Sequence, residues 1–88
     1  MKFDYTMDNG KVSEIDTETA TKEELKDFIY EDTFDFTLET VLDMGKDLND
    51  EVFVGCVAND YATDKFKDAL PLKEIDKIVD EVTFNLID

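Results

Sequence analysis

Carboxylates at regular spacing are the side chains of this chain that could do chemistry. Six acids follow one another at intervals of four residues: Asp27, Glu31, Asp35, Glu39, Asp43 and Asp47. In a helix a step of four residues rises about 6 Å, so these carboxylates would lie on adjoining turns. Like charges at this spacing destabilise a helix by about 0.2–0.5 kcal/mol per pair. A series that bears such a cost indicates a use, and imitation of the regular charge of a nucleic-acid backbone is the use that it suggests.

Negative charge is concentrated around this series. Residues 27–51 hold nine acids and one base, Lys46, which gives −8 of the total net charge of −15. Because steps of four drift about 40° around a helix axis, an unbroken row would reach the core side. We therefore expect a kink near residues 32–33 and two partner-binding clusters: Asp27, Glu31 and Asp32, then Asp35, Glu39, Asp43, Asp47, Asp50 and Glu51.

Composition limits the partners. The chain has 88 residues, 24 acids against nine bases, and 42% hydrophobic residues, which favours one folded, acidic domain over residues 1–88. Direct binding to nucleic acid or to an anionic membrane is disfavoured because both surfaces would be negative. The expected partner is therefore a basic, nucleic-acid-binding protein.

Enzymatic and metal chemistry find little support. A carboxylate pair such as Asp35 and Glu39 could do acid–base work on glycosides, but so many acids supply such pairs by chance. The chain has no histidine and one cysteine, which argues against zinc. It also lacks a glycine-rich phosphate loop and a calcium-loop pattern. We expect no enzyme activity, no cofactor and no metal.

Cys56 is the only cysteine, so it cannot form an internal disulfide. It lies in the apolar run 52–58, which predicts a buried core thiol. No segment has the apolar length of a membrane span or a signal peptide. These features predict a cytoplasmic protein.

The N-terminal third predicts a hairpin and a helix. Alternation of Phe3, Tyr5 and Met7 with polar residues indicates a strand over 2–7. Asp8-Asn9-Gly10 then predicts a tight turn with positive φ at both central residues, and 11–15 the returning strand. Thr21 with Glu24 forms a capping-box pattern, which predicts a helix over 22–31.

The rest of the chain is less clear. Residues 33–38 alternate like a strand but also fit a helical stripe, and we favour a helix over 34–48. We expect Phe34 and Phe36 to pack in the core, although with Tyr30 they would add apolar contacts to a partner if exposed. The remaining expectations are a strand over 51–58, helices over 63–70 and 72–80, and a strand over 82–87. Together they predict an α+β domain: a hairpin plus central and C-terminal strands in a mostly antiparallel sheet, packed by three to four helices.

In size, net charge and the carboxylates from Asp27 to Asp47, the chain resembles the DNA-mimic inhibitors of phages and mobile elements, which include anti-restriction and anti-CRISPR proteins. This resemblance implies no particular fold. It implies an inhibitor that occupies the basic groove of a nuclease or defence enzyme and blocks substrate entry.

The segment from Thr37 to Asp43 and the following apolar run also resemble the acidic helix and next strand of the barstar family of nuclease inhibitors. The Tyr-Gly pair that precedes that helix in the family is missing. The alternative to both likenesses is a structural or regulatory interaction module whose acidity serves only solubility.

Overall fold

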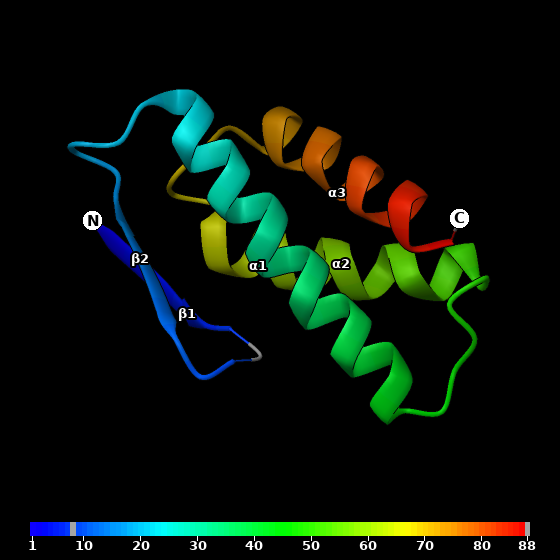
Figure 1. Cartoon of the computed structure of the whole chain (residues 1–88). Helices are drawn as coiled ribbons and strands as arrows, with labels where there is room; N and C mark the ends of the chain where they lie inside the picture. Colours follow the sequence, from blue (N-terminus) through cyan, green and yellow to red (C-terminus); the bar gives the residue numbers. More distant parts are fainter. Residues whose placement is uncertain (8, 88) are drawn as a thin grey trace.

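The computed structural model describes residues 1–7 and 9–87, and within them the chain forms one β-hairpin followed by three helices (Figure 1). The expected sheet with central and C-terminal strands is therefore wrong. The elements are β1 (Lys2–Thr6), β2 (Val12–Asp16), α1 (Lys22–Asp43), α2 (Glu51–Phe66) and α3 (Leu72–Ile87).

The hairpin was predicted correctly. β1 and β2 pair antiparallel, with Phe3 opposite Ile15 and Tyr5 opposite Ser13. Tyr5 is buried, while its neighbours in β1 are exposed on the other face. The turn differs from the expected one: in its described part only Gly10 has a positive φ, at +85°. Asp8, the first residue of the predicted turn, lies outside the described residues.

α1 is a single helix, so the expected kink and the separate helix over 34–48 are wrong. It begins at the predicted capping box, in which Thr21 and Glu24 each accept a hydrogen bond from the other's backbone N–H. It ends at Asp43, with Met44 as its C-cap, and Gly45 follows with a φ of +68°. The N–H groups of Gly45 and Lys46 donate to the carbonyls of Leu42 and Val41, the pattern of a Schellman motif.

α2 replaces the expected strand over 51–58 and helix over 63–70. Asp50 caps its first turn by accepting a hydrogen bond from the Phe53 N–H. Its core side is a row at intervals of four residues: Val54, Ala58, Ala62 and Phe66, all buried. Cys56 is exposed, so the expected core thiol is also wrong. The apolar run 52–58 suggests a strand that is buried on both faces. In the helix, however, Val52 lies in solvent, while Val54 and Ala58 are buried.

α3 runs unbroken through the expected strand over 82–87. Its buried residues follow helical spacing: Ile75, Ile78, Val79, Val82, Thr83 and Leu86. The alternation of Val82, Phe84 and Leu86 is misleading, since Phe84 points to solvent with 68% of its surface exposed.

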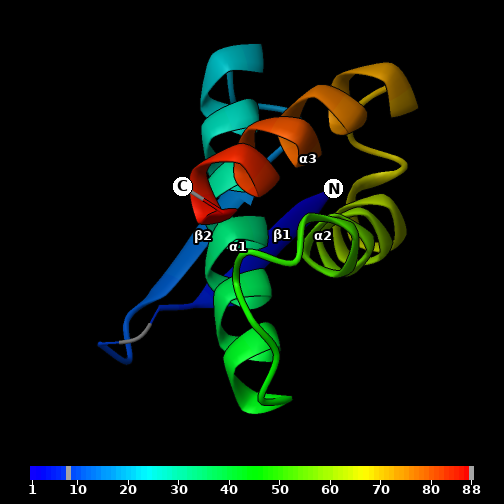
Figure 2. The same cartoon turned by 90° about the vertical axis from the view of Figure 1, so that its right-hand side faces the viewer.

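The buried residues form one hydrophobic core between α1, α2, α3 and the hairpin. Figures 1 and 2 show α1 crossing α2 and α3, with the hairpin against α1 and the end of α2. Aromatic rings join these parts: Phe3 lies 5.0 Å from Phe66 between ring centroids, and Tyr5 lies 5.3 Å from Phe28. The hairpin therefore packs an aromatic side chain against each of α1 and α2.

Candidate partner-binding surface

The acids of α1 stay on the surface of an unbroken helix because its core side winds with them. The buried row of α1 also has intervals of four residues: Leu25, Ile29, Thr33, Thr37 and Val41. Two residues after each member comes an acid, and two residues turn a helix by about 200°. We call these acids the acidic row: Asp27, Glu31, Asp35, Glu39 and Asp43. Each lies opposite the buried row at its own level, which is why no kink is needed.

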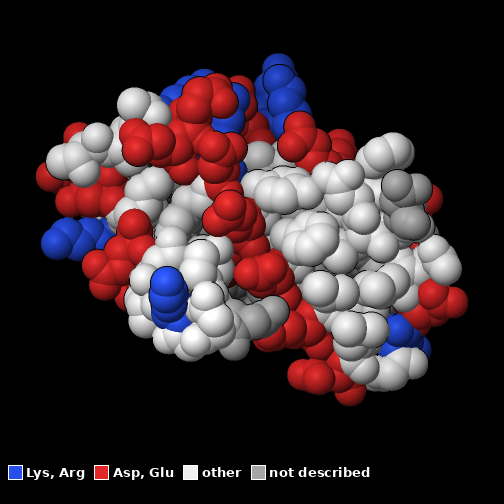
Figure 3. Space-filling view, in the orientation of Figure 1, with Lys and Arg blue, Asp and Glu red and all other residues white. Residues whose placement is uncertain are grey.

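The acidic row forms a visible band. Asp and Glu atoms follow α1 diagonally across the face in Figure 3, with uncharged surface beside them. Asp27, Glu31, Glu39 and Asp43 are exposed, and Asp35 is half-buried. No basic residue occurs between residues 27 and 43. The structure thus brings five of the nine predicted partner-binding residues together in the acidic row of α1.

Asp32 does not belong to this surface. It is 2% exposed, and its carboxylate lies 2.5 Å from the Lys65 ammonium and accepts a 2.8 Å hydrogen bond from the Tyr61 hydroxyl. Lys65 also donates to the Asp4 carbonyl of β1. Burial, together with the hydrogen bond to Asp32, raises the pKa of Tyr61. The charge of Asp32 is therefore used inside the molecule, where it ties α1 to α2 and the hairpin.

Glu31 is held from the hairpin side. The Tyr5 hydroxyl donates to Glu31 Oε2 at 3.3 Å, across the contact between β1 and α1. Burial, and then the neighbouring charge of Glu31, raise the pKa of Tyr5 to about 12. The hydrogen bond orients a carboxylate that remains exposed.

The last three predicted acids lie beyond α1. Asp47 accepts a hydrogen bond from the Asn49 N–H in the α1–α2 loop, and Asp50 caps α2. Asp47, Asp50 and Glu51 are exposed, but the Schellman turn separates them from the acidic row. Their spacing in the sequence does not continue the row in space.

Sequence reasoning missed an aromatic stack formed by Phe36 and Tyr61. Their ring centroids are 3.8 Å apart, with an angle of 8° between the ring planes. Phe36 is 39% exposed, so its expected place in the core is wrong. Tyr30 and Phe34 also stack, at 5.8 Å, and remain half-buried beside the acidic row. No local pattern points to a pair that joins residues 36 and 61.

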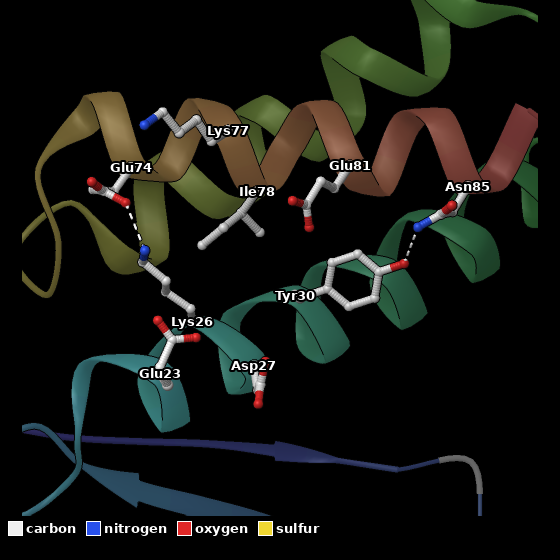
Figure 4. A pocket seen from close by; sticks show the side chains of 9 residues that line it. All are labelled: Glu23, Lys26, Asp27, Tyr30, Glu74, Lys77, Ile78, Glu81 and Asn85. Atoms are coloured by element: carbon white, nitrogen blue, oxygen red, sulfur yellow. Dashed lines mark hydrogen bonds and ion pairs between the residues drawn. The ribbon is translucent and has the colours of Figure 1, made fainter.

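The hollow in Figure 4 marks the N-terminal end of the acidic row. It measures about 450 Å³ and lies between α1 and α3. Lys26 pairs with Glu74 at 3.1 Å across it, which raises the pKa of Lys26 and lowers that of Glu74. Among the described residues, no group of three or more His, Cys, Asp or Glu side chains is placed to hold a metal ion.

Comparison with protein-family models, curated proteins and solved structures finds no match for this chain. Among the described residues, no helix is long and apolar enough to cross a membrane. The function must therefore be inferred from the geometry of the chain's own residues.

Proposed function

We propose that this protein is an acidic inhibitor that binds the basic nucleic-acid-binding surface of a nuclease or defence enzyme. The observation that carries the proposal is the acidic row: five carboxylates along α1, opposite its buried row and without an intervening base. The bound inhibitor would occupy the groove that nucleic acid enters. It would act by exclusion, with no catalytic residue.

The charge density of the acidic row indicates how it would bind. The row carries one charge per about 6 Å over about 24 Å of helix. One DNA strand carries a phosphate per about 3.4 Å of helix axis. The row therefore has roughly half the charge density of a strand, so it would pair with fewer basic residues of a groove than a strand of the same length. Its mimicry is of charge rather than of backbone shape.

The target class rests on the likeness in size and charge to the DNA-mimic inhibitors. The physical case for a basic partner is broader. A net charge of −15 on 88 residues steers a positively charged surface toward the protein and speeds association. The same forces make binding weaker as salt rises.

The test is retrieval and competition. The immobilised protein is exposed to a nuclease-treated lysate, bound proteins are eluted by rising salt, and a retrieved basic protein is assayed with labelled DNA or RNA. Wild-type protein should displace the nucleic acid, and less so at higher salt. The triple variant Asp27→Lys, Glu39→Lys and Asp43→Lys should lose most of this competition.

The matched control is Asp68→Lys, Asp76→Lys and Asp80→Lys. Asp68 lies in the turn after α2, Asp76 and Asp80 lie on α3, and all three are exposed; the control changes the net charge by the same amount. It should retain competition close to the wild-type level. Equal loss in both triple variants would show that only total charge matters, and the acidic row would not be the binding surface.

Two exposed apolar side chains favour the second candidate, a regulatory interaction module. Val52 is 76% exposed and Phe84 is 68% exposed. Under this alternative, Val52→Ser with Phe84→Ser abolishes retrieval of the partner, while reversal of charge in the acidic row does not. Retrieval that survives high salt would favour the same alternative, because hydrophobic contacts are not screened.

A further inference from the structure

The aromatic stack lies between two hollows on the α1–α2 side of the molecule. Phe36 and Tyr61 line both: one of about 550 Å³ toward Val57, and one of about 220 Å³ toward Tyr5 and Asp35. Tyr61 covers one face of Phe36. A partner group would therefore reach the opposite face or the edge of this ring.

Acids from two helices border the stack. Glu39 of α1 lines the smaller hollow, one turn beyond Phe36, because the winding acidic row has reached this flank of the helix. Asp60 and Asp64 of α2 line the larger hollow. The carboxylates of these two are exposed and make no hydrogen bond or ion pair with the residues that the structure describes.

One cation of the chain lies at the hydroxyl end of the stack. Lys65 donates to the Tyr61 hydroxyl at 3.2 Å and lies 5.5 Å from the centroid of that ring, and its charge is matched by Asp32. It is the one basic residue among those that line the two hollows. The other carboxylates that line the two hollows give the surface around the stack a negative charge, so this surface is complementary to a second cation.

A planar cation fits this surface better than a compact one. A guanidinium group stacks on an aromatic face and forms paired hydrogen bonds with carboxylates, whereas an ammonium acts as a strongly hydrated point charge. We propose that the Phe36 ring, bordered by Glu39, Asp60 and Asp64, takes an arginine side chain of the basic partner. This inference rests on the proposed function and adds the residue type that the surface selects.

The test compares two peptide probes, an arginine homopeptide and a lysine homopeptide of equal length, by calorimetry at one low ionic strength. A cation–π contact at an exposed site corresponds to about a two- to fivefold change in affinity. Phe36→Leu should weaken binding of the arginine peptide by this factor and leave the lysine peptide unchanged. Phe84→Leu, at an exposed phenylalanine that lines neither hollow, is the matched control and should change neither affinity.

Two further measurements keep the test decisive if Phe36→Leu is poorly folded by circular dichroism. Asp60→Asn with Asp64→Asn should weaken arginine-peptide binding more than Asp76→Asn with Asp80→Asn on α3. Backbone amide NMR shifts on addition of the arginine peptide should centre on Tyr61 and its α2 neighbours. An equal loss in the two double variants, or arginine-peptide binding that is unchanged in folded Phe36→Leu, overturns the proposal.

The outcomes separate this inference from the proposed function. If Phe36 governs the arginine peptide but charge reversal in the acidic row leaves nucleic-acid competition intact, the arginine site stands and the proposed function fails. If competition depends on the acidic row while Phe36→Leu leaves arginine binding unchanged, only the arginine site fails.

Discussion

At the scale of single residues, the buried row of α1 contains two threonines where apolar side chains would be expected. Thr33 and Thr37 are fully buried, and their hydroxyls have no hydrogen-bond partner among the described residues. Thr83 of α3, by contrast, donates to the Val79 carbonyl at 2.8 Å. An unpaired buried hydroxyl costs about 1–3 kcal/mol, so these two positions lower the stability of the fold.

Replacing Thr37 with valine should stabilise the protein. The change removes an unpaired hydroxyl and keeps a β-branched side chain of similar shape. We expect a gain of about 1 kcal/mol, which for a domain of this size corresponds to a melting temperature higher by about 4–8 °C. Urea unfolding measures the free energy directly. A loss of stability would mean that the hydroxyl has a partner, for example a buried water.

The phenol of Tyr5 should make stability depend on alkaline pH. Its pKa rises from 10.0 to about 12 in the folded protein, mainly through burial and then through Glu31. Because the pKa is higher in the folded protein, the contribution of Tyr5 to stability is complete below about pH 10. It is lost as the pH rises from 10 toward 12. Tyr5→Phe lacks this contribution, so its deficit in melting temperature should shrink between neutral pH and about pH 11. A constant deficit would contradict the assignment.

At the scale of elements, the sequence signals that predicted secondary structure correctly are those that depend on residues close together in the sequence. The capping box of Thr21 and Glu24 lies within one turn, and the alternation of Phe3 and Tyr5 within one strand. The strands over 51–58 and 82–87 were wrong because a short apolar run does not distinguish two buried strand faces from one helical stripe with exposed neighbours. Asp50 as an N-cap and Gly45 as a C-terminal stop are local signals that could have corrected the bounds.

The candidate site was predictable in part, for a geometric reason. The acids of α1 and its buried residues both recur every four positions, with each acid two positions after a buried residue. This shift of two positions, visible in the sequence, keeps the two rows on opposite sides of the helix. The ion pair that removes Asp32 from the acidic surface was not predictable, because Asp32 and Lys65 are 33 positions apart in the sequence. The same holds for the stack of Phe36 on Tyr61, which exists only because α2 is a helix that packs beside α1.

Asp43→Lys should stabilise α1 while it weakens partner binding. Asp43 is the last residue of α1, where a negative charge opposes the helix dipole, and it repels Glu39 one turn earlier. A lysine there reverses both effects, and we expect about 1 kcal/mol of added stability. Unfolding in urea and competition against nucleic acid would show the two opposite changes. A variant that is less stable would contradict the cost that we assign to the acidic row.

At the scale of the whole molecule, net charge and size act together. The Cα positions extend over 38 × 31 × 20 Å and the net charge is −15. At about 0.01 M salt the Debye length is about 30 Å, so nearly every acid repels every other acid. At about 0.15 M it is about 8 Å, and repulsion is limited to near neighbours such as those in the acidic row.

Salt should therefore have opposite effects on folding and on binding. The melting temperature of the free protein should rise between about 0.01 M and 0.15 M sodium chloride, because screening weakens self-repulsion in the compact state. Affinity for a basic partner should fall over the same range. Asp27→Lys with Glu39→Lys and Asp43→Lys should flatten both dependences, since it removes repulsion and attraction together. The control on Asp68, Asp76 and Asp80 should flatten the melting curve to a similar degree but leave the binding curve steep. If salt changes both quantities in the same direction, long-range charge does not dominate the behaviour of this molecule, and the exposed apolar side chains become the better explanation of its binding.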